Sequence, residues 1–225
     1  MRFPVKLVLY PLLLLALLVV AGVYFLDVAV ERGIETVGTR VARVEVALDG
    51  AGISLYSGQG ALRGLRVANP AGYRAPYAVR VGQVQVALKP LSVLSDRVVV
   101  RSVVVQGPEI HYEKRGGKTN LDVIRANVES TVKRTDAGKR LQIDSLIIRD
   151  AKVYFYEKRD KPPRVLTLKE IHLQDLGKGP EGLTGAELTR KITDKVIEET
   201  AAAVAKVVGL GIAGHALFGV LGLPF

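Results

Sequence analysis

Apolar and polar positions alternate along most of the chain beyond residue 40, in short runs separated by turn residues. In VQVALK, residues 84–89, the side chains of Val84, Val86 and Leu88 share one face while the polar residues point the other way. This is the period of a half-buried strand, and RVEVALD, residues 43–49, repeats it. Strand after strand with one apolar face predicts a mainly β protein built on an antiparallel sheet with flanking helices.

One phrase occurs twice in this strand-rich region. VRSVVVQGPEIHYEKR, residues 100–115, returns as IDSLIIRDAKVYFYEKR, residues 143–159. Aligning Ser102 with Ser145 places VVV on LII. A gap of one residue in the first copy then aligns the YEKR endings. The recurrence predicts a repeated structural unit, a hairpin of apolar strand, polar kink and aromatic strand, in preference to a duplicated binding site. A shift of alternation at residues 169–170 separately indicates a β-bulge.

Two amphipathic helices are predicted, one near 120–134 and a long one toward the C-terminus. Thr119 with Asp122, and Thr184 with Glu187, have the spacing of a capping box at the two helix starts. Apolar stripes at helical spacing support both helices: Leu121, Ile124, Val128 and Val132 in the first, and Leu188, Ile192, Val196, Ala203 and Val207 in the second.

The N-terminus predicts a membrane anchor. The run from Leu7 to Leu26 carries no charge, and a helix of that length spans roughly 30 Å, the thickness of a bilayer's hydrocarbon core. Arg2 and Lys6 favour a cytoplasmic N-terminus with the body on the far side of the membrane. A cleaved signal peptide, with VVA at residues 19–21 as its cleavage site, is the alternative, and the length of the apolar run favours the anchor.

These segments divide the chain into three parts. Residues 1–27 form the anchor, residues 28–180 a β-rich domain, and residues 181–225 the C-terminal amphipathic helix with a Gly-rich apolar tail. The glycines of the tail and the charged start of the helix before it favour an interfacial or groove-plugging segment. A second membrane span is the alternative.

The composition limits the partners and the reactive groups that the chain can have. The 225 residues carry a formal charge of +10, from 32 Lys and Arg against 22 Asp and Glu, which suits anionic partners. A body beyond a membrane meets no nucleic acid, so anionic lipid is the expected partner. The chain has no cysteine, which excludes disulfides and thiolate chemistry. Its three histidines stand apart and its acidic residues are scattered, so we expect no enzyme activity, no metal and no cofactor.

Basic residues gather where strands are predicted to end. The two YEKR endings supply Lys114, Arg115, Lys158 and Arg159 as candidate contacts to lipid head groups, each contributing roughly 1 kcal/mol near an anionic surface. Strand ends that are simply solvated are the alternative interpretation of these charges.

Four motifs stand between residues 60 and 125. They are L-x-x-L-x-V-x-N-P-x-G-Y from Leu62 to Tyr73, K-P-L-S-x-L from Lys89 to Leu94, G-P-x-I from Gly107 to Ile110, and G-x-x-N-L-D from Gly117 to Asp122. In this order, after an N-terminal membrane helix, they resemble the AsmA-like family of bacterial inner-membrane-anchored periplasmic envelope proteins. The resemblance implies an inner-membrane anchor, a body in the periplasm, and a sheet curved into a hydrophobic groove.

The resemblance further implies that the groove binds or hands on phospholipid, in membrane lipid homeostasis or outer-membrane biogenesis. The chain is shorter than the members that bridge the periplasm, so holding or handing on lipid suits it better than transport across the envelope. The candidate groove-lining side chains are Val84, Val86, Leu88, Val103, Val104, Val105, Leu146, Ile147 and Ile148.

The alternative is a membrane-anchored periplasmic scaffold or assembly subunit that transports no lipid, because its own helices cover the sheet. The helix over residues 184–208 is then the candidate contact to an envelope protein partner. No oligomeric state follows from the sequence.

Overall fold

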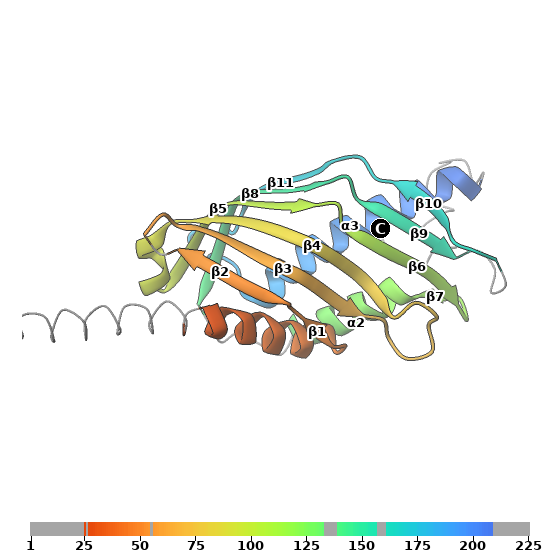
Figure 1. The fold of residues 1–225 in the computed structure, drawn as a ribbon, viewed down its shortest axis with the longest axis horizontal. Helices are drawn as coiled ribbons and strands as arrows, with labels where there is room; N and C mark the ends of the chain where they lie inside the picture. Colours follow the sequence, from red (N-terminus) through yellow and green to blue (C-terminus); the bar gives the residue numbers. More distant parts are fainter. Residues whose placement is uncertain (1–24, 26, 55, 133–138, 157–160, 209–225) are drawn as a thin grey trace, which may run out of the picture.

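The computed structural model describes residue 25 and residues 27–54, 56–132, 139–156 and 161–208. Its strands form one mixed sheet of eleven, with the path β10-β9-β6-β4-β5-β8-β11, and β3 pairs with the other side of β4 (Figure 1). The strands are β1 (Val46–Ala47), β2 (Gly50–Ser54), β3 (Gln59–Ala68), β4 (Tyr77–Leu88), β5 (Arg97–Gln106), β6 (Glu109–Arg115), β7 (Lys118–Thr119), β8 (Arg140–Arg149), β9 (Lys152–Tyr156), β10 (Arg164–Thr167) and β11 (Ile171–Leu176). A short 3₁₀ helix, η1 (Pro90–Leu94), joins β4 to β5.

The prediction of a purely antiparallel sheet is wrong, because β5 pairs with β8 and β6 with β9 in parallel. Parallel neighbours need a long crossover connection, and here it contains helix α2 (Asn120–Val132). Parallel strands usually lose their alternation because both sheet faces are buried. In this chain helices cover only one face, yet β5, RVVVRSVVVQ, carries apolar residues on both faces, as is usual for a strand in parallel pairing.

The two copies of the repeated phrase are the strands that run in parallel. Ser102 lies opposite Ser145, as the sequence alignment predicts, and the VVV and LII runs pair residue by residue. The hairpin prediction is wrong: β5 and β6 both pair with β4, at different places along it, as two halves of one interrupted strand. The YEKR endings are out of step by one residue, since Glu113 lies opposite Tyr156.

A line of backbone kinks crosses the sheet at the middle of these strands. Gly64, Gly107 and Asp150 all have positive φ angles, of 61°, 58° and 52°, and Gly107 N donates to the carbonyl of the residue before Asp150. The bulge predicted at residues 169–170 is a break between two strands: β10 ends at Thr167 and pairs with β9, and β11 begins at Ile171 and pairs with β8. Kinks in adjacent strands bend a sheet, and this line divides it into two halves.

Each kink changes which residues face the helices. Val105 before the kink and Ile110 after it are five positions apart and would face opposite sides of a regular strand, yet both line the same cavity. At each kink the residues that face the helices change from one set of alternate positions to the other. Neighbouring strands make this change at the same level, so the apolar face continues from one half of the sheet to the other.

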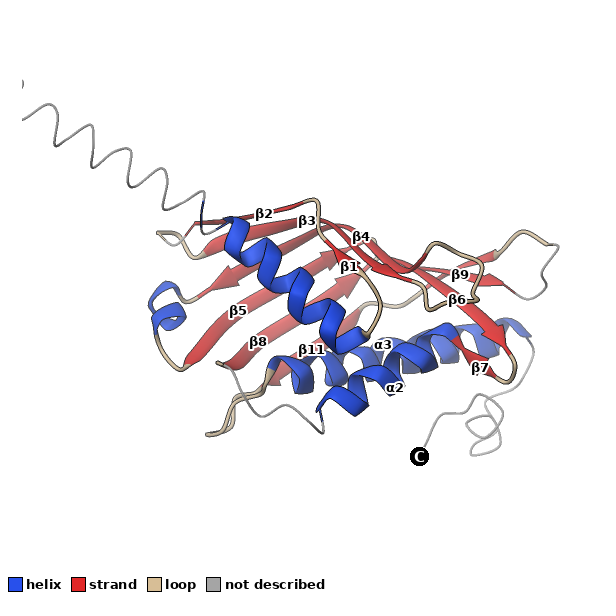
Figure 2. Cartoon of the chain, turned by 90° about the horizontal axis from the view of Figure 1, so that it is seen from below, coloured by secondary structure: helices blue, strands red, loops and turns tan. Residues whose placement is uncertain are grey.

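Three helices cover that apolar face (Figure 2). The two predicted helices are confirmed as α2 and α3 (Gly185–Val208), and both capping boxes form: Thr119 N donates to Asp122 and Thr184 N to Glu187, each over 2.8 Å. A third helix, residues 27–42, was not predicted. Val132 and Val207, the last residues of the two predicted stripes, have side chains outside the described residues.

Most of the predicted anchor and the Gly-rich tail lie outside the described residues. Within the described part of the chain, none of the helices is long and apolar enough to cross a membrane. The anchor over residues 7–26 therefore stays a prediction.

Substitution of Gly64 by Ala tests the kink line. The backbone at Gly64 is in the left-handed region, and a Cβ there would lie 1.9 Å from Asp49 Oδ2. The Asp49 carboxylate forms an ion pair with Arg66 at 2.7 Å. We expect Gly64→Ala to lower the free energy of unfolding by about 1–2 kcal/mol, measured by urea denaturation. Gly82→Ala is the control, because a Cβ there meets nothing within 4 Å, and an equal loss in both variants would contradict the account.

Candidate functional site

A cavity of about 350 Å³ lies between the sheet and the three helices. Its sheet wall includes a row of directly paired side chains, Val84, Val105, Ile148 and Ile171, which come from four neighbouring strands. Beyond the kink line a second row, Val67, Val79 and Ile110, continues the same wall. The kinks thus allow both halves of the sheet to contribute to one apolar surface.

Each of the three helices supplies part of the opposite wall. Ile34 and Ala42 come from the N-terminal helix, Ile124 and Val128 from α2, and Ile192 and Val196 from α3. Helix contacts hold this wall together: Asn127 Nδ2 on α2 donates to the Ala42 carbonyl over 2.9 Å, and Arg125 Nε on α2 lies 2.8 Å from Asp194 Oδ1 on α3.

The cavity wall is chemically inert. Among the described residues that line it, the side-chain oxygens are the hydroxyls of Thr189 and Thr193 and none of the side chains is charged. Thr189 donates to the Gly185 carbonyl over 2.8 Å. The described residues contain no group of His, Asp and Glu side chains able to hold a metal ion. Such a wall offers dispersion contacts and the exclusion of water, which suit a hydrocarbon group.

The nine side chains predicted to line a groove divide between the two faces of the sheet. Val84, Val105 and Ile148 line the cavity. Val103 and Leu146 pack in the core beside them, and Val86 pairs with Val103 in the same row; the seventh residue on this side, Leu88, is buried farther along β4.

Val104 and Ile147 do not line the cavity, because they pair with each other on the opposite face of the sheet. Successive residues of a strand alternate between faces, so a run of three apolar residues cannot face one cavity. Val104 instead borders a shallow depression on the outer face, next to Gln85 and Ser102.

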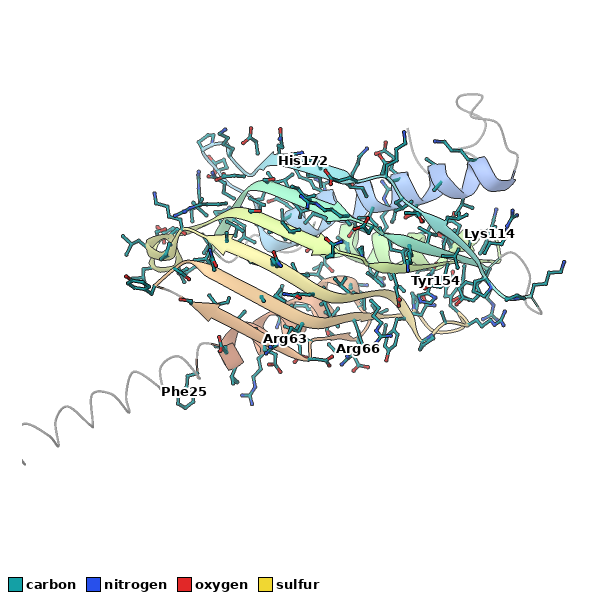
Figure 3. The ribbon with its side chains drawn as sticks, turned by 45° about the horizontal axis from the view of Figure 1, so that its top comes forward. Phe25, Arg63, Arg66, Lys114, Tyr154 and His172 are labelled. Carbon is teal, nitrogen blue, oxygen red and sulfur yellow. The ribbon has the colours of Figure 1, made fainter. Side chains whose placement is uncertain are left out.

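Two of the four predicted head-group contacts, Lys114 and Arg115, are among the described residues. Lys114 and Arg115 are exposed at the end of β6, and Lys114 lies at the opposite end of the molecule from Phe25, near which the chain enters the described region (Figure 3). Arg115 donates to the Gly72 carbonyl. Lys158 and Arg159 lie outside the described residues.

Sequence reasoning missed the contribution of the N-terminal helix to the cavity. Val30, Ile34 and Val41 have helical spacing, but they directly follow the predicted membrane run, which hides a second amphipathic segment. Gly38 allows this helix to approach the sheet, because a Cβ there would lie 2.9 Å from Val46 Cγ1.

The fold and the cavity define a kinked β-sheet protein built around an apolar internal site. The sequence profile of the AsmA family matches residues 5–214. The chain therefore belongs to the AsmA family. No individual curated protein matches the sequence.

A buried polar network explains the first and last of the four motifs. Glu113, only 6% exposed, accepts hydrogen bonds from Asn69 Nδ2 at 2.9 Å and from the backbone N–H groups of Arg74 and Ala75 at 2.7 Å. Asn120, fully buried, donates to Asn69 Oδ1 over 2.8 Å and accepts from Glu113 N. The N-P-x-G-Y loop is thus fastened to β6 and to the start of α2.

The face of β6 that carries Glu113 also carries a cluster of rings. His111 stacks on Tyr154 with 5.0 Å between ring centroids and lies 2.9 Å from the Tyr156 hydroxyl through Nδ1, and the Arg74 guanidinium lies 5.6 Å from the Tyr156 ring. Burial lowers the pKa of His111 below 6.5, against the opposite effect of nearby carboxylates. On the inner face, burial raises the pKa of Tyr112 to about 12.

Removal of the Glu113 carboxylate tests the polar network. Glu113→Ala leaves Asn69 Nδ2 and the N–H groups of Arg74 and Ala75 without their acceptor, and unsatisfied buried donors cost about 1–3 kcal/mol each. We expect a loss of at least about 2 kcal/mol in the free energy of unfolding, whereas Lys114→Ala, one exposed residue further on, should change it by less than about 0.5 kcal/mol. Equal small effects would show that the loop is held by other contacts.

The His111 cluster predicts a dependence of stability on pH. Because the folded chain holds the His111 proton less tightly than the unfolded chain, this histidine's contribution is complete above pH 6.5 and is lost as the pH falls below that value. We expect the melting temperature to fall between about pH 7.5 and about pH 5, and His111→Phe to reduce that fall. His172→Phe, at an exposed position of β11, is the control; an identical pH profile in His111→Phe and the unchanged chain would contradict the assignment.

Proposed function

We propose that this protein is anchored in the bacterial inner membrane, with its body in the periplasm, and holds a phospholipid acyl chain in the cavity between sheet and helices. In this role it receives and hands on lipid, and so contributes to membrane lipid homeostasis or outer-membrane biogenesis. It acts as a binding protein and not as an enzyme. The observation that carries the proposal is the uncharged cavity wall, built from side chains of all three helices and both halves of the sheet.

Membership of the AsmA family supports an envelope or lipid-related function. The cavity adds a physical reason. Its volume of about 350 Å³ falls within the range of about 300–1,000 Å³ that small-molecule sites occupy. An acyl chain in the cavity would remove apolar wall surface from water, which is favourable by roughly 25 cal/mol for each Å², and a ligand that binds only the folded chain stabilises the fold.

The scaffold alternative gains one observation, that helices cover the apolar face of the sheet. However, α3, the helix predicted as the contact to a partner, has its apolar stripe turned inward: Leu188, Ile192 and Val196 pack against the core. The outward residues of α3 are charged, and Lys195 forms ion pairs with Glu198 and Glu199 at 3.1 and 2.9 Å. A protein partner of α3 would therefore meet a polar surface.

Filling the cavity tests the lipid proposal. In Val105→Phe/Ile148→Phe, two paired side chains of the sheet wall gain rings that occupy the space for an acyl chain. The full chain is purified from membranes in mild detergent, and bound phospholipid is counted by native mass spectrometry. We expect bound lipid per protein to fall several-fold relative to the unchanged chain.

The control places the same rings one residue away. Val104 and Ile147 pair on the outer face of the same two strands, so Val104→Phe/Ile147→Phe adds equal bulk outside the cavity. Thermal unfolding shows whether both variants fold, because overpacking costs about 1–3 kcal/mol. Equal lipid content in two folded variants would contradict the proposal and favour the scaffold.

A further inference from the structure

Large apolar side chains are exposed at one end of the molecule. Tyr56 is 100% exposed, Leu94 86%, Leu91 79% and Phe25 69%. They come from three separate segments: the β2–β3 turn, η1 and the start of the N-terminal helix. All three segments lie at the end of the sheet from which the chain continues toward residue 1 (Figure 1).

Hydrogen bonds hold these segments together. Ile53 N, at the end of β2, donates to Asp27 Oδ1 at the start of the N-terminal helix over 2.9 Å. Leu88 N donates to the Gly58 carbonyl over 2.6 Å, which joins the β2–β3 turn to the strand that leads into η1. The exposed apolar residues therefore belong to segments that are held together at one end of the molecule, and we call Phe25, Tyr56, Leu91 and Leu94 the apolar tip.

The geometry of η1 fixes two members of the apolar tip. Ser92 is buried, its hydroxyl donates to the Lys89 carbonyl over 2.6 Å, and it accepts from Val99 N over 2.9 Å. With Ser92 turned inward, Leu91 and Leu94 are presented outward. Residues three apart in a 3₁₀ helix lie one above the other, so the two leucines point in the same direction.

Basic residues border the η1 side of the apolar tip. Lys139 donates to the Val93 carbonyl within η1, Arg140 N donates to the Asp96 carbonyl over 2.8 Å, and Lys89 immediately precedes η1. Arg97 begins β5 beside them. Apolar side chains bordered by Lys and Arg are the composition of surfaces that bind the head-group and acyl boundary of anionic bilayers.

We propose that the apolar tip inserts into the head-group and acyl boundary of the membrane that residues 7–26 are predicted to enter. The uncharged run ends at Leu26, next to Asp27, which is bonded to the sheet. The chain thus leaves no linker between the predicted span and the tip, and the bilayer is the surface that the tip meets first. This inference needs the predicted span but no occupant in the cavity.

The absence of cysteine makes the test direct. Single cysteines are introduced by Leu94→Cys, Tyr56→Cys and Val165→Cys in the full chain, and each is labelled with an environment-sensitive fluorophore. The labelled proteins are reconstituted into vesicles of phosphatidylethanolamine and phosphatidylglycerol, some of which carry a spin-labelled acyl chain as quencher. Val165 is the matched control, because it is an apolar residue with 54% exposure on β10, at the other end of the sheet (Figure 1).

We expect blue-shifted emission and several-fold stronger quenching for the labels at positions 94 and 56 than for the label at position 165. Labels that are equally exposed to water at all three positions would overturn the proposal. The apolar tip would then be a surface that binds a protein, which pure lipid vesicles do not contain. Vesicles of phosphatidylcholine alone test the basic border: a weaker shift supports its contact with anionic head groups, and an unchanged shift overturns that part of the assignment.

Discussion

The structure depends on the in-register parallel pairing of two interrupted strands. β5 with β6, and β8 with β9, keep the same register on both sides of the interruption, from Ser102 opposite Ser145 to Glu113 opposite Tyr156. A slip of one residue would move every side chain to the other face. Because the register is kept, the kinks at Gly107 and Asp150 lie side by side. In both strands the set of residues that faces the helices therefore changes at the same level.

This alignment explains the cavity. A flat strand pair would present one apolar face to the helices without interruption, whereas the kinked pair bends and turns both of its halves inward. Straight helices cannot follow the bend at every point, and the volume between them and the sheet remains. Toward the apolar tip, the row of Val86, Val103, Leu146 and Leu173 directly follows the cavity row, so the apolar face continues from the cavity toward the end that we place at the membrane.

The sequence predicted those parts of the fold that are local. Capping boxes and apolar stripes located α2 and α3, and the shift of alternation located the break between β10 and β11, although as a bulge; these signals depend on neighbours in the chain. Parallel pairing was not predicted, since it depends on a crossover through α2 that alternation does not encode. The same limit affected the site: Val104 and Ile147 were assigned to the cavity wall with their neighbours, although the alternation of a strand already separates them. The side chains contributed by the N-terminal helix required the tertiary structure.

The central claim is that the space between sheet and helices receives an acyl chain. Photocrosslinking tests it most directly: the full chain is reconstituted with a phospholipid that carries a diazirine within its acyl chain, illuminated, digested and mapped by mass spectrometry. The account predicts adducts on cavity residues such as Val105 of β5 and Ile192 of α3. Adducts confined to residues 1–26 and to the outer face, with the cavity peptides unlabelled, would contradict it.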